Sequence, residues 1–268
     1  MARSRTAVQA NLRSGTAAAI TREQQIAMSQ HHPGRDQHQA AAGGDRIDRG
    51  PAGAEQRLVL LHGWGADADD LCDLGVLLGG PELSVVALRA PLPHPGGGGR
   101  QWYDLQQPGW PQLPAARRDL RRRLLALAND IPLSRTVVLG FSQGAALALD
   151  VATAAEGLPL AGVIACSGYP HPDWQPGAVE AGQGGPVPAV LLTHGRQDPV
   201  VPYAASEALL QQLRGSGRPA QLIGFAGGHA IDIADAALSE ALGRFLQACW
   251  HGAGQRRLRD TCADSSPE

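Results

Sequence analysis

Lysine is missing from this sequence of 268 residues, so the 23 residues counted as lysine or arginine are all arginine. Its absence excludes a Schiff-base lysine, a phosphate-loop lysine and a lysine general base. Cysteine is scarce as well, with four residues and no C-x-x-C spacing. In a chain of this length the pattern favours buried free thiols over a disulfide framework, at Cys72, Cys166, Cys249 and Cys262.

Long apolar runs are also missing. None approaches the ~20 residues needed to span a bilayer, and the apolar stretch at 17–20 is too short for the core of a signal peptide. The formal net charge of −2 gives no global reason to bind nucleic acid or an anionic membrane. We therefore expect a cytoplasmic protein, monomeric or homodimeric, with no membrane span and no nucleic-acid partner.

The two ends of the chain differ in composition from the middle. Residues 1–54 are rich in Ala, Gln, Arg, Gly and Ser without an apolar period, which predicts a disordered N-terminal extension. An organelle transit peptide, or an upstream extension before Met28, are the alternatives. Residues 251–268 are expected to form a polar C-terminal tail. One domain would then occupy residues 55–250, and the histidines of the N-terminal extension would belong to a polar tail rather than a metal site: His31, His32 and His38.

Within the middle part, six short apolar runs predict strands, at residues 57–61, 83–88, 136–139, 160–165, 189–192 and 221–225. Helical stripes separate most of them, and two are clear: Leu120, Leu124 and Leu127, then Leu238, Leu242, Phe245 and Leu246. The arginines at 117, 118 and 121–123 fall largely off the first stripe, which favours a solvated helix face over a nucleic-acid patch. Buried strands that alternate with helices predict an α/β fold whose mostly parallel sheet is covered on both faces.

A candidate nucleophile follows the strand at 136–139. The residues there are Gly140-Phe141-Ser142-Gln143-Gly144, and a helix-forming run rich in alanine and leucine comes next. This is the G-x-S-x-G pattern in its strand–turn–helix context, in which the serine occupies a sharp turn and projects its hydroxyl above the sheet. Side chains at the two glycine positions would clash with that turn. The alternative is a glycine-rich turn with an inert serine.

A general base and an acid are sought downstream, because in this arrangement the order along the chain is serine, acid, histidine. His229 follows the strand at 221–225, and Asp198 follows the strand at 189–192. We expect His229 to take the serine proton and Asp198 to fix the imidazole tautomer. His194 precedes the acid and is expected to hold its loop. The remaining rivals lie in irregular or polar segments: His171, Asp173, Glu180 and His251.

An oxyanion hole needs two backbone N–H groups. Gln143 follows the nucleophile and supplies one. The other is expected from Trp64, in the turn Leu61-His62-Gly63-Trp64-Gly65 after the strand at 57–61. Residues 94–99 resemble the HGGG motif of some lipases, but Pro95 interrupts it, which favours a flexible loop.

These motifs together resemble the phospholipase/carboxylesterase family, which includes acyl-protein thioesterases and small bacterial carboxylesterases. The shared features are LHGWG at 61–65, Ala-Pro at 90–91, Trp-Tyr-Asp at 102–104, GFSQG at 140–144, HGRQDPVVP at 194–202 and GGH at 227–229. The resemblance covers about residues 55–248 and implies a single-domain α/β-hydrolase without a lid, since residues 168–188 are too irregular for one. It also implies oxyanion N–H groups from Trp64 and Gln143. The chain departs from the family at Ala66, where Asp is common, and in its glycine-rich segment 92–100.

The function expected from this set is a serine carboxylesterase that forms an acyl-enzyme on a small ester or thioester, with no metal and no cofactor. The alternatives are an acyl-protein or acyl-CoA thioesterase, a lysophospholipase, a serine peptidase and a non-enzymatic ligand receptor. Four aromatic residues near predicted strand ends are expected to line an acyl groove, with core packing as the alternative: Trp102, Tyr103, Tyr169 and Trp174.

Overall fold

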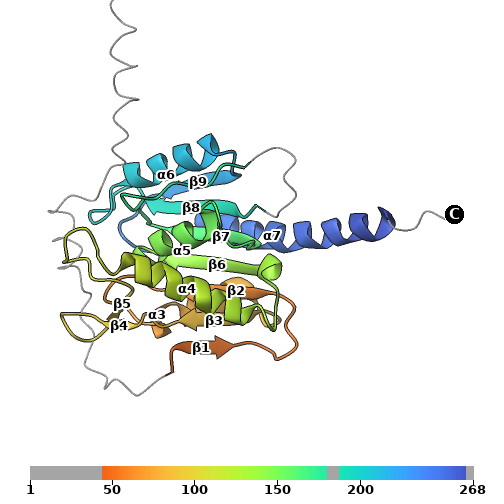
Figure 1. Ribbon diagram of the computed structural model, residues 1–268, viewed down its shortest axis with the longest axis horizontal. Helices are drawn as coiled ribbons and strands as arrows, with labels where there is room; N and C mark the ends of the chain where they lie inside the picture. The colour runs from red at the N-terminus through yellow and green to blue at the C-terminus, as the bar shows by residue number, and fades with distance from the viewer. Residues whose placement is uncertain (1–43, 180–186, 264–268) are drawn as a thin grey trace, which may run out of the picture.

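A seven-stranded sheet forms the centre of the computed structural model, which describes residues 44–179 and 187–263 (Figure 1). The spatial order is β1-β3-β2-β6-β7-β8-β9, and every neighbouring pair is parallel except β1 with β3. The strands are β1 (Arg46–Arg49), β2 (Arg57–Leu61), β3 (Ser84–Leu88), β6 (Thr136–Phe141), β7 (Gly162–Cys166), β8 (Ala189–Gly195) and β9 (Ala220–Phe225). All six predicted strands are present, and the mostly parallel sheet is confirmed.

Helices cover both faces of the sheet, as the alternating pattern predicts (Figure 1). One face carries α4 (Leu113–Leu127), α5 (Gln143–Thr153) and α6 (Tyr203–Gly215), and the other carries α3 (Asp69–Gly79) and α7 (Ala236–Ala263). A short 3-10 helix, η1 (Leu133–Arg135), leads into β6. Successive residues of a buried strand serve the two cores in turn: Leu58 and Leu60 pack toward α3 and α7, Val59 and Leu61 toward the other three helices.

The folded part begins earlier than the sequence predicts. The boundary at residue 55 is wrong for residues 44–54, because β1 pairs antiparallel with β3 at the edge of the sheet. Its sequence, RIDR, carries no alternating apolar pattern, and Ile47 alone among its four residues packs on the core. An edge strand of this kind is held by backbone hydrogen bonds, and charged side chains on an exposed edge are normal. The disorder predicted for residues 1–43 concerns a segment outside the described residues.

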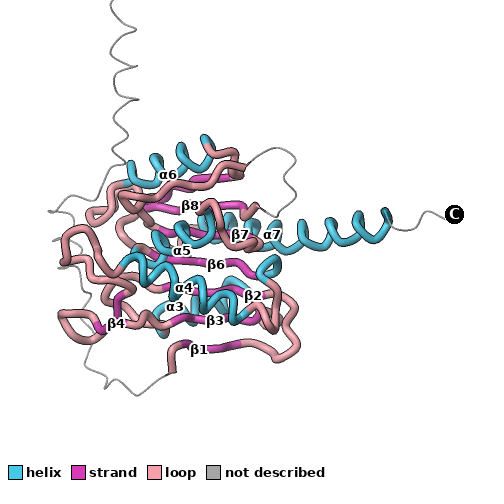
Figure 2. Tube along the Cα trace, viewed as in Figure 1, coloured by secondary structure: helices cyan, strands magenta, loops and turns pink. Residues whose placement is uncertain are grey.

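The last helix is longer than expected. α7 continues to Ala263, past the start of the C-terminal tail predicted at residue 251, and extends beyond the sheet as a single rod (Figure 2). Leu238, Leu242 and Leu246 of its first half are fully buried, which confirms the predicted stripe. Across the described part of the chain, no helix combines the length and apolar character needed to cross a membrane.

Candidate active site

The turn after β6 holds Ser142 in a strained conformation. Its backbone has φ 51° and ψ −113°, a region that non-glycine residues rarely adopt, and its N–H donates to the carbonyl of Cys166 at 2.8 Å. A side chain on Gly140 would lie 2.6 Å from the Cα of Ala145, and one on Gly144 would overlap the carbonyl oxygen of Leu61. The two glycines therefore let strand, turn and helix approach closely enough to place Ser142 at the carboxyl edge of the sheet.

His229 lies between Ser142 and Asp198, with one ring nitrogen toward each. Its Nε2 is 3.0 Å from the Ser142 Oγ, and its Nδ1 is 2.7 Å from the Asp198 Oδ2. The carboxylate accepts from Nδ1–H, so the lone pair of the neutral ring is at Nε2, where it accepts the serine proton. The ring of Phe141 packs 4.9 Å from the imidazole and restricts its tilt. The three residues predicted separately are thus brought into one hydrogen-bonded row.

The side chain of Asp198 is completely buried, in the loop that follows β8. Burial raises the pKa of this carboxyl, but hydrogen bonds from His194 and His229 and from the backbone N–H of Val201 outweigh it and hold the pKa below its usual range. Its Oδ1 accepts from the N–H groups of Val200 and Val201, at 2.8 and 2.9 Å. The carboxylate is therefore fixed in place and ionised.

The expected oxyanion turn lies directly against Ser142. A Cβ built on Gly63 would lie 3.0 Å from the Phe141 Cδ1 and 3.5 Å from the Cβ of Ser142, so the turn packs closely on Phe141 and stands in contact with the serine. Gln143 is the first residue of α5, and its backbone N–H has no acceptor within the helix. The indole of Trp64 donates a 2.8 Å hydrogen bond from Nε1 to the Gln101 Oε1.

The four aromatic residues expected to line an acyl groove belong to the core instead. Their exposed fractions are 1% for Trp102, 0% for Tyr103, 0% for Tyr169 and 6% for Trp174. Their polar atoms point inward: the Trp102 indole donates to the carbonyl of His62, and the hydroxyls of Tyr103 and Tyr169 contact each other at 2.6 Å. Sequence places these residues near strand ends, but it does not determine the direction of their side chains.

The rival acids and bases lie elsewhere or outside the described side chains. His171 is buried, with Nδ1 2.6 Å from the Asp150 Oδ2, and Asp173 binds Arg117 through both carboxylate oxygens at 2.7 Å. The described part of residues 168–188 forms no helix. It packs against α5 through Trp174, whose indole donates to the hydroxyl of Thr153, the last residue of that helix. Glu180 and the side chain of His251 lie outside the described residues, as do the N-terminal histidines.

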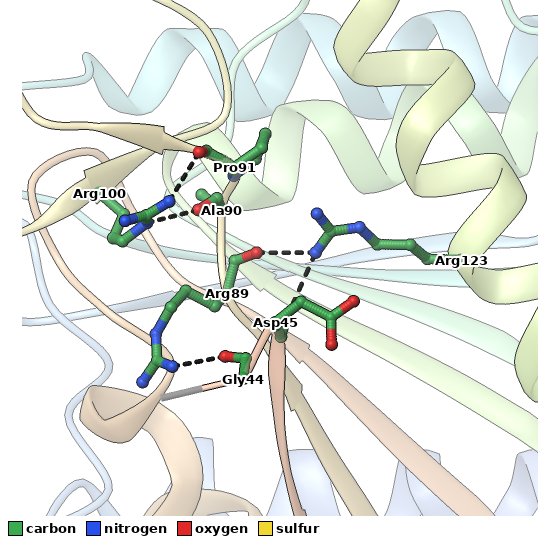
Figure 3. A pocket seen from close by; sticks show the side chains of 7 residues that line it. All are labelled: Gly44, Asp45, Arg89, Ala90, Pro91, Arg100 and Arg123. Atoms are coloured by element: carbon green, nitrogen blue, oxygen red, sulfur yellow. Dashed lines mark hydrogen bonds between the residues drawn. The ribbon is translucent and has the colours of Figure 1, made fainter. Parts of the chain in front are cut away.

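A polar pocket of about 290 Å³ lies around the end of β3, and three arginines surround it (Figure 3). Each guanidinium already donates to protein acceptors. Arg100 donates to the carbonyl of Ala90, Arg123 to the carbonyl of Arg89, and Arg89 to the carboxylate of Asp67. The pocket therefore contributes no reactive group to the row formed by Ser142, His229 and Asp198.

A sequence profile identifies the family. The profile of the phospholipase/carboxylesterase family matches residues 43–249, most of the chain. The chain belongs to the phospholipase/carboxylesterase family. Its sheet and covering helices are those of a single-domain α/β-hydrolase, and the family indicates an ester hydrolase.

Solved structures of esterases resemble the chain over most of its length. Esterase PE8 is 30% identical with a TM-score of 0.61, and the match covers 76% of this chain and 97% of that one. A Bacillus cereus carboxylesterase is 21% identical with a TM-score of 0.64, covering 76% and 93%. A Mesorhizobium loti carboxylesterase is 23% identical with a TM-score of 0.62, covering 73% and 91%. Because the last two structures share less than a quarter of their residues with this chain, their likeness shows the fold alone.

Proposed function

We propose that this member of the phospholipase/carboxylesterase family is a serine carboxylesterase with Ser142 as nucleophile, His229 as general base and Asp198 as the acid. The observation that carries the proposal is the row of two short contacts, 3.0 Å from the serine to the imidazole and 2.7 Å from the imidazole to the carboxylate. This is the geometry that converts a weakly nucleophilic hydroxyl into an attacking group.

Acylation begins with the Ser142 Oγ adding to the ester carbonyl carbon while the His229 Nε2 takes the hydroxyl proton. Asp198 stays ionised and stabilises the imidazolium, as its lowered pKa favours. The carbonyl oxygen becomes an oxyanion that accepts from the backbone N–H groups of Trp64 and Gln143. Collapse of this intermediate breaks the ester C–O bond, and His229 returns the proton to the departing alkoxide. An acyl-enzyme and a free alcohol result.

Deacylation repeats the same steps with water. His229 removes a proton from a water molecule, which attacks the acyl carbon, and the same two N–H groups hold the second oxyanion. The intermediate then expels the Ser142 oxygen, which regains its proton from the imidazolium. The acid leaves and the resting site is restored, with no redox change and no additional reactant.

Hydrolysis of p-nitrophenyl butyrate by purified protein tests the proposal. The Ser142→Ala variant is expected to lose on the order of 10⁶ in kcat, as removal of a triad serine does elsewhere. A fluorophosphonate probe should label the natural protein and leave this variant unlabelled. Hydrolysis that survives Ser142→Ala overturns the assignment of the nucleophile. A natural protein that neither hydrolyses esters nor reacts with the probe overturns the enzyme and favours a ligand receptor on the same fold.

The leaving group and chain length are addressed by a matched series. Oxygen esters and thioesters of the same acyl chains, from two to sixteen carbons, are compared by kcat/KM. A higher kcat/KM for the oxygen ester at every length supports the carboxylesterase proposed here. A consistent preference for thioesters reassigns the protein as a thioesterase that uses the same three residues.

A further inference from the structure

The segment 100–103, which we call the clamp, runs alongside the oxyanion turn. The N–H of Gly65 donates to the carbonyl of Arg100 at 2.9 Å, and the N–H of Arg100 donates to the carbonyl of Ala66 at 2.8 Å. The next residue, Gln101, accepts from the Trp64 indole at 2.8 Å through its side-chain oxygen. The first half of the clamp therefore fixes both the backbone and the indole of the turn that carries the Trp64 N–H.

The second half of the clamp binds the side chain of Gln143, the other proposed oxyanion donor. The N–H of Trp102 donates to the Gln143 Oε1 at 3.0 Å, and the Gln143 Nε2 donates to the carbonyl of Tyr103 at 2.7 Å. Both ends of this amide are thus bonded to consecutive residues, and the side chain has 0% exposure. One continuous stretch of four residues consequently fixes Trp64 on one side and Gln143 on the other.

A buried chain of hydrogen-bonded side chains holds Tyr103, the last residue of the clamp. The Tyr103 hydroxyl lies 2.7 Å from the His171 Nε2, and the His171 Nδ1 lies 2.6 Å from the Asp150 Oδ2. Arg117 pairs with the same carboxylate. Tyr103, His171 and Asp150 are 0%, 1% and 6% exposed, so water does not compete for the hydrogen bonds between them. Asp150 is on α5, the same helix that begins with Gln143.

The directions of these hydrogen bonds follow from the donors present. The Asp150 carboxylate accepts from Nδ1–H, so the Nε2 of the neutral His171 ring accepts from the Tyr103 hydroxyl. The Tyr103 oxygen can then accept from Tyr169, which lies 2.6 Å away. Burial raises the pKa of Tyr103 well above its ordinary value, so the hydroxyl keeps its proton and donates.

We propose that Tyr103, Gln101 and the Asp150–His171 pair are positioning residues that hold the two oxyanion N–H donors in one geometry through the clamp. The inference rests on the proposed function, because it assigns Trp64 and Gln143 as those donors. Oxyanion holes work by being fixed before charge develops, and a small displacement of a donor weakens the transition state more than the bound substrate. Tyr103 thereby acts on the reaction from the core, without touching the substrate.

The Tyr103→Phe variant tests the anchor, since it removes one hydroxyl and leaves the ring. We expect kcat for p-nitrophenyl butyrate to fall about tenfold with KM within about twofold of the natural value, the signature of a loss confined to the transition state. A trifluoromethyl ketone forms a tetrahedral adduct whose oxyanion occupies the same hole, and its Ki should rise by a similar factor.

Thr153→Val is the matched control, because it also removes a buried hydroxyl near-isosterically, from α5 but away from the clamp. A merely structural role for Tyr103 predicts that both variants lower Tm and leave kcat and Ki unchanged well below that temperature. A folded Tyr103→Phe variant with kcat and Ki within twofold of the natural protein overturns the proposal.

Gln143→Met provides a second route if Tyr103→Phe does not fold. It keeps the backbone N–H and removes both amide bonds to the clamp, so the same rise in Ki and fall in kcat are expected, and unchanged values overturn the proposal. The two hypotheses fail differently. A natural protein without esterase activity refutes the proposed function, whereas an active natural protein with unaffected variants refutes the clamp alone.

Discussion

His194 lies 3.2 Å from Asp198, measured from Nε2 to Oδ2, on the same oxygen that accepts from His229 at 2.7 Å. The Nε2 of His194 is also 2.9 Å from the carbonyl of Val201, and its Nδ1 is 2.7 Å from the Ser206 Oγ. Two oxygen acceptors at Nε2 assign the proton to that nitrogen, so Nδ1 accepts from Ser206. A second, fully buried histidine thus secures Asp198 and the loop that carries it.

Replacement of His194 should weaken the candidate active site while leaving Ser142, His229 and Asp198 unchanged in sequence. His194→Leu removes the hydrogen bond to Asp198, so we expect a raised pKa for that carboxyl and a loss of about 2 kcal/mol in the free energy of unfolding, the order of a hydrogen bond to a charged group. kcat/KM should fall about tenfold, or about 1.4 kcal/mol in transition-state binding. His194→Gln keeps an N–H donor and should lose less. Urea unfolding and initial rates at pH 7.5 measure both effects, and a leucine variant equal to the natural protein contradicts them.

Acid should destabilise the protein through Asp198. Its pKa is lower in the folded than in the unfolded state, where it is about 3.9. The unfolded state therefore binds the proton more readily, so this stabilising contribution is complete above about pH 5 and declines as pH falls through 4 and below. Urea unfolding from pH 5 to 3 should show a difference in the free energy of unfolding between the natural protein and Asp198→Asn that narrows below pH 4. A difference independent of pH contradicts this prediction.

The sequence predicts those parts of the fold that depend on apolar pattern. Every predicted strand is present, because a strand buried on both faces requires a short continuous apolar run, and the leucine stripes of α4 and α7 are buried, because each helix turns one apolar face to the sheet. Strand β1 was missed because an exposed edge strand needs no such run. Ser142, Asp198 and His229 could be singled out as candidates because each follows a strand whose carboxyl end lies at one edge of the sheet.

The clamp and its anchor could not be predicted in the same way. Tyr103, Asp150 and His171 come from three segments far apart in the chain, and only the tertiary fold brings them together. One signal was present: Asp150 is the single charged residue in the otherwise uncharged helix α5, and a buried carboxylate needs a partner. Arg117, expected on a solvated face, is one of those partners.

Backbone strain at Ser142 predicts an unusual order of stabilities. Ser142→Ala keeps a Cβ at φ 51°, whereas Ser142→Gly removes it, and such a conformation costs about 1–3 kcal/mol in a residue with a side chain. Both variants lose the hydroxyl and its contact with His229. The free energy of unfolding of the glycine variant should therefore be about 1 kcal/mol higher than that of the alanine variant, the reverse of the usual order. Thermal and urea unfolding compare them, and an alanine variant that is the more stable contradicts strain at this turn.

Gly144 packs closely against the turn that follows β2. Gly144 lies in the first turn of α5, where alanine would ordinarily stabilise by about 1 kcal/mol. In this position its methyl group would overlap the carbonyl oxygens of Leu61 and His62, so Gly144→Ala should lower the free energy of unfolding by more than about 2 kcal/mol. It should also lower kcat, because those carbonyls lead into the turn that carries Trp64. Gly243→Ala in α7, with open space around the added carbon, is the matched control and should be neutral or stabilising. Equal effects of the two substitutions would mean that helix propensity, rather than contact with the carbonyl oxygens of Leu61 and His62, determines the outcome at Gly144.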